Sequence, residues 1–250
     1  MAGRASGSWR AKNCTGEFSP HDAAGIHAGR GRAFHSLDVP YAFLGAVVLP
    51  LLVDDPELSE IRPTKDVDLT VKVVTLSALY QLEEKLRAAG FRNDTREGAP
   101  ICRWVVSGVT VDVMPTEGSV LGMSAAWFRE ALETASNKSL GEGVLAPVIE
   151  SPCFLATKLA AFRDRGLKDL YLSKDLEDIL TLLDGCESIV ALVREAPSPV
   201  GSFLVRELAI HLRNPEFVDA LPGFFRTDEV SLARMLLVKE RLAQLADLPG

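Results

Sequence analysis

Two aspartates, Asp66 and Asp68, stand two positions apart at the start of a segment that is rich in β-branched residues. Apolar and polar residues alternate over residues 67–74 (VDLTVKVV), a pattern that predicts a β-strand. Side chains at positions i and i+2 of a strand point to the same face of the sheet. We therefore expect both carboxylates to face the same way, from a strand that is otherwise largely apolar.

A third aspartate, Asp112, lies in another apolar segment, residues 109–114. This segment and residues 101–106 flank Ser107-Gly108, a dipeptide that is typical of a β-hairpin turn. If the strand of Asp112 neighbours the earlier strand, three carboxylates converge. Carboxylates about 4 Å apart repel by several kcal/mol at a surface-like dielectric constant, so a divalent metal ion would make the cluster tolerable. Ligand sets made only of oxygen favour Mg²⁺ or Mn²⁺.

Each of these aspartates has a simpler interpretation, in which it merely ends a strand or forms a turn. For Asp66 alone we would favour that interpretation. Aspartate is depleted in strands, however, and here a pair inside one apolar strand is joined by a third aspartate inside another. The combination favours metal chemistry.

The rest of the pattern predicts an α+β fold, with a small mixed β-sheet lobe followed by a helical lobe. The first half indicates a strand over residues 39–44, a helical turn over 46–52 and a helix over 76–89. Helices are predicted in the second half over residues 124–134, 152–165, 173–183, 188–195, 200–213 and 229–246. Residues 1–36 contain six glycines and no periodicity, so we expect a disordered extension. The expected domains are residues 1–36, 37–122 and 123–250.

Composition excludes several classes of protein. With 47% hydrophobic and 24% charged residues over 250 positions, the chain has the make-up of an ordinary globular protein. It lacks an apolar run of about 18 residues, so we expect no membrane span. The 27 Lys and Arg residues against 34 Asp and Glu leave a net charge of −7, which disfavours binding to duplex DNA. The four scattered cysteines form no CxxC pair, which argues against a zinc ribbon and favours reduced thiols in the cytoplasm.

The segment around the aspartate pair carries a family resemblance. Residues 62–69 (RPTKDVDL) resemble the R-x-T-x-D-[IV]-D-[LF] signature of minimal bacterial members of the DNA polymerase beta-type nucleotidyltransferase fold. These members include the AbiEii/AbiGii toxin-like nucleotidyltransferases of type IV toxin–antitoxin systems. Residues 152–185 are similar to the lysine-bearing helix and the D-L-x-D segment of the same family. The resemblance covers roughly residues 39–185 and implies a polymerase beta-like sheet lobe.

The resemblance implies a role for each matching residue. Asp66 and Asp68 would bind Mg²⁺ or Mn²⁺, and Asp112 would complete the metal site and activate the acceptor hydroxyl. The residues implied in binding the nucleoside triphosphate (NTP) are Gly45, Ala46, Arg62, Lys65, Lys158 and Asp175. The usual Gly-[Gly/Ser] pair of the fold is Gly45-Ala46 here, so a phosphate-binding hydroxyl is missing. Taken alone, Lys158 would be a solvated helix residue, and Asp175 would favour the first turn of its helix.

Three functions remain open at this stage. In the first, the chain transfers a nucleoside monophosphate from an NTP to a hydroxyl on an RNA or tRNA end or a protein. The resemblance to toxin-like members adds the hypothesis of a toxin that has an antitoxin partner. In the second, suggested by Ala46, it binds a nucleotide or a partner with weak or no catalysis. In the third, it modifies small molecules of the aminoglycoside type.

Overall fold

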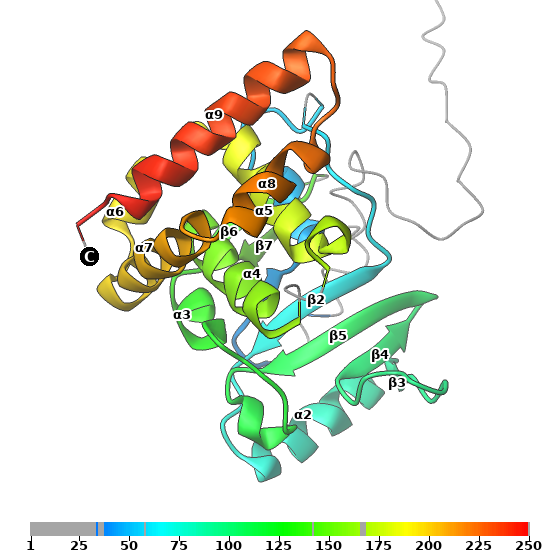
Figure 1. The fold of residues 1–250 in the computed structure, drawn as a ribbon. Helices are drawn as coiled ribbons and strands as arrows, with labels where there is room; N and C mark the ends of the chain where they lie inside the picture. The colour runs from blue at the N-terminus through cyan, green and yellow to red at the C-terminus, as the bar shows by residue number, and fades with distance from the viewer. Residues whose placement is uncertain (1–33, 35–37, 58, 142, 166–168, 250) are drawn as a thin grey trace, which may run out of the picture.

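The computed structural model describes Phe34 and residues 38–57, 59–141, 143–165 and 169–249. These residues form an α+β fold with a seven-stranded mixed sheet and helices on both of its faces, as predicted (Figure 1). The predicted extension, residues 1–36, lies outside the described residues except for Phe34. That side chain is buried and packs edge-on against Phe43.

The sheet has the strand order β3-β4-β5-β2-β1-β7-β6. Its central strand β2 runs parallel to β5 and antiparallel to β1. The hairpin predicted around Ser107-Gly108 is confirmed, because both residues have positive φ, as its tight turn requires. The strands are β1 (Tyr41–Leu44), β2 (Asp66–Val71), β3 (Arg92–Asn93), β4 (Arg103–Val106), β5 (Val109–Pro115), β6 (Ser136–Ser139) and β7 (Leu145–Val148).

Three strands of the sheet, β3, β6 and β7, were not predicted from the sequence, and β3 has only two residues. β6 is a polar edge strand (SNKS), and β7 contains Pro147, so neither has the alternation that identifies a strand. β7 joins the sheet by pairing in parallel with β1. The sheet therefore includes chain that follows residue 122.

The helical prediction for residues 124–134 is too long. Trp127 adopts a left-handed conformation with φ of 70°, and α3 begins only at Phe128. A left-handed residue cannot continue a right-handed helix, which explains the late start. The other predicted helices are confirmed within a few residues, and the short α8 was not predicted.

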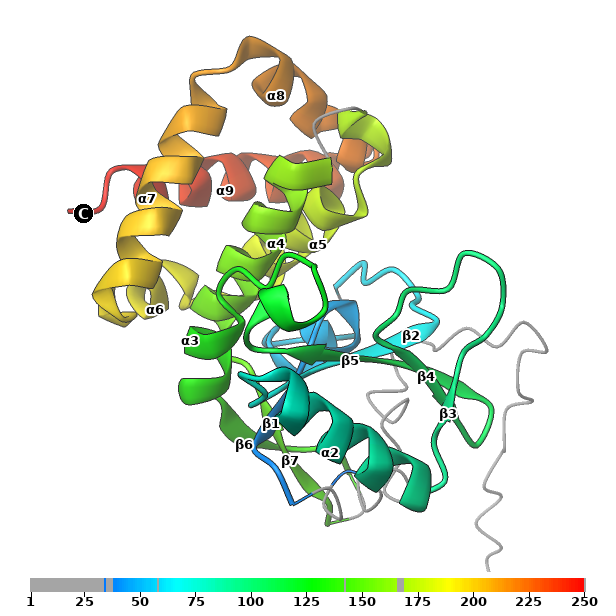
Figure 2. The ribbon, with the colours of Figure 1, turned by 90° about the horizontal axis from the view of Figure 1, so that it is seen from below.

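The helices lie on both sides of the sheet. α2 covers one face, whereas α4 and α5 lie on the other side with the remaining C-terminal helices beyond them (Figure 2). They are α2 (Leu76–Ala88), α3 (Phe128–Glu133), α4 (Ser151–Arg165), α5 (Lys174–Gly185), α6 (Ile189–Glu195), α7 (Ser198–Leu212), α8 (Pro215–Ala220) and α9 (Glu229–Ala246). The 3₁₀ turns are η2 (Ala46–Leu51), η3 (Gly118–Val120), η5 (Leu170–Leu172) and η6 (Leu221–Phe224). Within the described ranges, no helix has both the length and the apolar character needed to cross a bilayer.

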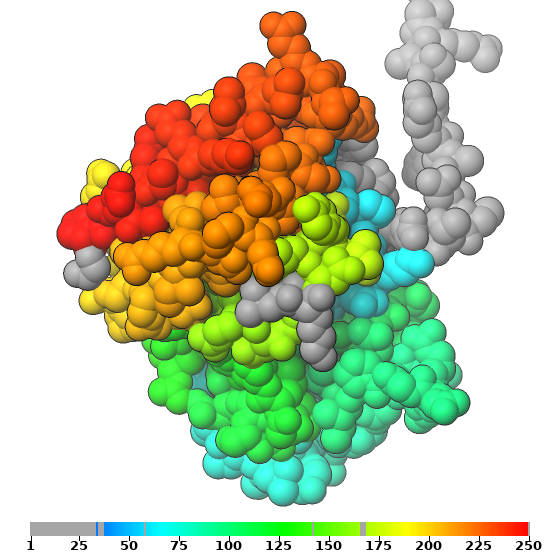
Figure 3. Space-filling view, in the orientation of Figure 1, coloured from blue at the N-terminus to red at the C-terminus, as the bar shows by residue number. Residues whose placement is uncertain are grey.

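The alternation along β2 decides which face of the sheet is available for chemistry. Val67, Leu69 and Val71 are buried on the face that α2 covers. Their neighbours Asp66 and Asp68 point to the opposite face, toward α4 and α5. The space-filling view shows the α4–α5 region packed directly on the sheet part of the molecule (Figure 3). The carboxylates therefore lie at the junction of the sheet and the helices.

Candidate functional site

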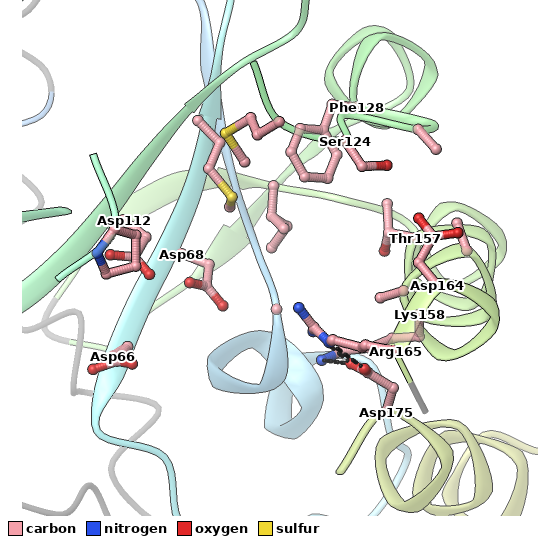
Figure 4. A pocket seen from close by; sticks show the side chains of 18 of the residues that line it. Asp66, Asp68, Asp112, Ser124, Phe128, Thr157, Lys158, Asp164, Arg165 and Asp175 are labelled. Carbon is pink, nitrogen blue, oxygen red and sulfur yellow. Dashed lines mark hydrogen bonds and ion pairs between the residues drawn. The ribbon is translucent and has the colours of Figure 1, made fainter. Parts of the chain in front are cut away.

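The three aspartates come from neighbouring parallel strands and share one face of the sheet. Asp68 on β2 is the direct partner of Asp112 on β5, and Asp66 lies two positions earlier on β2. Figure 4 shows Asp66 and Asp68 along one strand, with Asp112 beside them on the next. The expected adjacency of the two strands is thus confirmed, since the parallel register places all three side chains on one surface.

Gly45 follows the last residue of β1 and lies directly against the Asp68 side chain. Leu44 pairs with Asp68, and the next residue, Gly45, turns the chain into η2 with φ of 77° and ψ of −171°. A Cβ atom at this position would collide with the Asp68 carboxylate and lie only 2.8 Å from its Cγ. This region of φ and ψ is nearly restricted to glycine. Gly45 therefore permits a close approach between the turn and the carboxylate.

Arg103 is the ion-pair partner of two of the three aspartates. It lies opposite Asp112 in the β4–β5 hairpin, and its Nε and Nη2 atoms each donate a 2.8 Å hydrogen bond to Asp112. Nη2 also donates a 3.0 Å hydrogen bond to Asp66. The hydrogen bonds to Asp112, together with the negative charges of Asp112 and Asp66, raise the pKa of Arg103 above its usual value. The guanidinium thus neutralises part of the carboxylate cluster.

Asp68 has a different environment from the other two carboxylates. Among the described residues it has neither an ion pair nor a side-chain hydrogen bond. Burial raises the pKa of Asp68 to about 7; Lys158 opposes the shift, whereas Asp112 and Asp66 add to it. Asp68 is therefore the carboxylate of the cluster whose charge is least compensated.

The chemistry of the donor set suits a divalent metal ion, but the arrangement of the side chains does so only in part. All three candidate ligands offer carboxylate oxygens, which suit Mg²⁺ or Mn²⁺. Across the described ranges, however, no group of three or more His, Cys, Asp or Glu side chains is placed to hold a metal ion. In this arrangement both oxygens of Asp112 and one oxygen of Asp66 accept hydrogen bonds from Arg103.

Cationic side chains face the carboxylates from the helices. Lys158 and Arg165 lie two turns apart on one face of α4, and both line the same cavity as Asp66 and Asp68 (Figure 4). Arg165 donates hydrogen bonds of 2.8 and 3.1 Å to Asp175 on α5. Burial alone would raise the pKa of Asp175, but Arg165 and Lys158 lower it below its usual value. Asp175 therefore stays charged and helps to position both cations.

Lys158 is also held by a second carboxylate of α5. Its Nζ lies 2.7 Å from an oxygen of Asp178, and 3.4 Å from an oxygen of Asp175. Asp178 has no exposed side-chain surface, and it accepts two further hydrogen bonds from Arg62. A buried carboxylate is stable when it is paired and hydrogen-bonded in this way. Lys158 is therefore a fixed part of the cavity wall.

Two adjoining cavities, of about 470 and 610 Å³, share Asp66, Asp68 and Lys158 in their walls. The first extends past Asp112 to an apolar wall with Met114, Met123 and Phe128. Cationic side chains line the second: Arg62, Lys65, Lys158, Arg165 and Lys174. The nine site residues expected from the sequence all line one or both cavities: Gly45, Ala46, Arg62, Lys65, Asp66, Asp68, Asp112, Lys158 and Asp175. Their functional roles remain predictions.

Sequence reasoning missed several residues of the site. Arg165 and Lys174 were not expected there, although the seven-residue spacing of Lys158 and Arg165 places them on one helix face. The position of Arg103 could have been derived from the hairpin, because Arg103 and Asp112 are equally far from its turn. The pairing of Arg62 with Asp178 has no local signal in the sequence.

Comparisons with known proteins give a similarity of fold at low sequence identity. No protein-family model matches the chain, and no curated protein matches it. An antigenic nucleotidyltransferase-like protein from Paracoccidioides brasiliensis is 20% identical, with a TM-score of 0.47, covering 83% of this chain and 95% of that chain. A candidate nucleotidyltransferase from H. pylori is 12% identical, with a TM-score of 0.40, covering 91% and 94%. Because both TM-scores are below 0.5, neither similarity decides the family or the activity of this chain.

Proposed function

We propose that this chain is a nucleotidyltransferase that moves a nucleoside monophosphate from an NTP to a hydroxyl acceptor and releases pyrophosphate. One observation carries the proposal. Asp66 and Asp68, next to Asp112 on the neighbouring strand, face Lys158 and Arg165 across a cavity. Carboxylates opposite fixed cations are what an enzyme needs to hold a triphosphate and a metal ion together.

The cation-lined cavity of about 610 Å³ is the proposed site of the triphosphate. The chain as a whole has a net charge of −7, yet five Lys and Arg side chains line this one cavity. Positive groups gathered in a cleft attract anionic ligands and hold them by charge-assisted hydrogen bonds. Gly45 and Ala46, at the start of η2, line these cavities and would contribute backbone rather than a side-chain hydroxyl.

In the proposed reaction the acceptor oxygen forms a bond to the α-phosphorus as the bond from that phosphorus to the bridging oxygen breaks. Pyrophosphate leaves with the electron pair of the broken bond, and the hydroxyl proton passes to a carboxylate, for which Asp112 is the candidate. Lys158 and Arg165 would hold the departing phosphates. Mg²⁺ or Mn²⁺, bound by Asp66 and Asp68, would neutralise the phosphate oxygens and stabilise the leaving group.

The acceptor, the partner and the cellular setting follow the family resemblance. We propose an RNA or tRNA end or a protein side chain as the acceptor, and an antitoxin partner if the chain is an AbiEii/AbiGii-type toxin. The cytoplasm is the compartment we propose, because the three cysteines among the described residues, Cys102, Cys153 and Cys186, are unpaired, which suits a reducing environment.

A second candidate function is nucleotide or partner binding with weak or no catalysis. Two observations favour it. Arg103 binds Asp66 and Asp112, the carboxylates that a two-metal reaction would use. Ala46 stands where the fold usually has a glycine or a serine next to the phosphates. Both features leave the cation-lined cavity intact, so nucleotide binding is expected under either function.

A labelling experiment separates the two functions. The purified protein is incubated with each of the four α-³²P-labelled NTPs and Mg²⁺ or Mn²⁺, in the presence of total tRNA, a soluble lysate or an aminoglycoside panel. The test variant is Asp66→Ala/Asp68→Ala. The matched control is Asp164→Ala, because Asp164 is an exposed carboxylate at the wall of the same cavity.

Transfer of label to a discrete product by the wild type and Asp164→Ala, but not by the double variant, is the expected result. Circular dichroism would establish that the double variant is folded. Label that the folded double variant transfers at the wild-type rate would contradict the proposed catalytic site. A folded wild type that binds NTP and labels nothing would favour the binding function.

A further inference from the structure

The guanidinium of Arg103 binds two of the three carboxylates of the cluster, those of Asp66 and Asp112. Both oxygens of Asp112 and one oxygen of Asp66 accept its hydrogen bonds, at distances of 2.8 to 3.0 Å. The contact follows from the hairpin register, in which Arg103 and Asp112 are opposite each other. The pairing of β4 with β5 places Arg103 beside Asp112, so the contact does not depend on the movement of a loop.

The environment of this contact makes it stronger than a surface ion pair. The side chain of Asp112 is 13% exposed and that of Arg103 is 22% exposed. Water and salt screen such a pair less than an exposed one. The two parallel N–H···O bonds to Asp112 also match the fork geometry that makes Arg–carboxylate pairs strong. A divalent ion that uses Asp112 must therefore overcome the charge and the hydrogen bonds of Arg103.

The geometry points to Arg103 as a built-in counterion that competes with divalent cations for Asp66 and Asp112. While Arg103 binds these two residues, a cation can use only Asp68 and the Oδ1 atom of Asp66, which Arg103 does not contact. Without Arg103, all three carboxylates on this surface would be available to a cation. The inference takes only the kind of ion from the proposed function, since metal binding can be measured without turnover.

Titration with Mn²⁺ tests the competition, with the free ion followed by electron paramagnetic resonance. The test variant is Arg103→Gln, which removes the charge and keeps a polar side chain. Its matched control is Arg96→Gln, because Arg96 is a nearby exposed arginine that binds Asp94 outside the cluster. A third variant, Arg103→Gln/Asp112→Asn, removes the carboxylate that Arg103 would have released.

We expect Arg103→Gln to bind Mn²⁺ at least about tenfold more tightly than the wild type, because a unit charge within hydrogen-bonding distance strongly opposes a cation. The control should stay within about twofold of the wild type, and the Asp112→Asn double variant should lose the gain. A structural role of Arg103 alone would not produce a gain that depends on Asp112.

Arg103→Lys is a second test variant, to be used if Arg103→Gln does not fold. Lysine keeps the charge but cannot form two parallel hydrogen bonds to one carboxylate, so an intermediate affinity is expected. Equal Mn²⁺ affinity in the Arg103 variants, Arg96→Gln and the wild type would overturn the inference, whether or not the wild type transfers nucleotides. A gain in a protein without transferase activity would support the inference and count against the proposed function alone.

Discussion

Arg62 and Asp178 lie 116 positions apart in the chain, and the guanidinium donates hydrogen bonds of 2.7 and 2.8 Å to the carboxylate. Asp178 has no exposed side-chain surface, and Lys158 binds the same carboxylate at 2.7 Å. The three residues therefore connect the segment before β2 to α4 and α5 at the wall of the cation-lined cavity. Arg62 has two consequences for the site: it contributes charge to the cavity, and it fixes the carboxylate that positions Lys158.

Replacement of Arg62 by methionine should destabilise the fold strongly. Without Arg62, Lys158 is the one cation left to balance the charge of the buried Asp178 carboxylate among the described ion pairs. Breaking a buried ion pair typically costs about 3 to 5 kcal/mol. We expect the free energy of unfolding in urea to fall by about 3 kcal/mol. The triple variant Arg62→Met/Lys158→Met/Asp178→Leu should recover much of that loss, because it removes Asp178 together with both cations that bind it, and well-packed apolar side chains often replace buried ion pairs at little cost. A triple variant as unstable as Arg62→Met would contradict this account.

Gly45→Ala should damage the protein more than a similar change at another glycine with positive φ. Alanine at position 45 meets both an unfavourable backbone conformation and the Asp68 carboxylate. Gly90, with φ of 88°, offers a matched control, because a Cβ atom there meets nothing within 4 Å. The backbone strain alone costs about 1 to 3 kcal/mol in either variant. We expect the midpoint of thermal unfolding to be clearly lower for Gly45→Ala than for Gly90→Ala. Equal midpoints would contradict the close approach of Gly45 to the Asp68 side chain.

Arg165→Gln should weaken NTP binding at a smaller cost in stability than Arg62→Met. The Arg165 side chain is 72% exposed, so water can replace part of its contact with the buried Asp175, which also keeps its ion pair with Lys158. It lines both cavities, however, where its charge would act on the phosphates. We expect the dissociation constant for NTP to rise about tenfold, measured by isothermal titration calorimetry. Arg163→Gln, on the same helix but outside both cavities, is the control, and equal effects of the two changes would contradict a role for Arg165 in binding.

Local pattern predicts the parts of this fold that carry the carboxylates. Alternation identifies β2 and β5, and Ser107-Gly108 identifies the hairpin that brings Arg103 opposite Asp112. In these segments the residue preferences agree with the fold, so short stretches of sequence suffice. The convergence of the three aspartates needs one further assumption, that β2 and β5 are neighbours, and the structure bears it out.

The features that sequence analysis missed depend on contacts between distant segments. β6 and β7 become strands because the edge of β1 is available for pairing, not because of their own residues. The partnership of Arg62 with Asp178 joins segments 116 positions apart, and nothing near either residue indicates it. The start of α3 depends on the left-handed conformation of Trp127, which is uncommon for a residue with a large side chain.

His211 on α7 should make the stability of the protein fall in mild acid. It packs against Phe162 of α4 and Phe217 of α8, with ring centroids 5.1 and 5.2 Å apart, and within the described residues its Nε2 has no hydrogen-bond partner. Burial lowers the pKa of His211, whereas the charge of Glu207 opposes the shift.

The unfolded chain therefore binds a proton at His211 more readily than the folded chain. Unfolding becomes easier as the pH falls below the ordinary histidine pKa of about 6.5, by up to about 1.4 kcal/mol per pH unit. His211→Phe fills the same aromatic cluster without a titrating group, so urea unfolding between pH 8 and pH 5 should show a shallower loss of stability. Parallel pH profiles for the two proteins would mean that other groups account for the acid sensitivity.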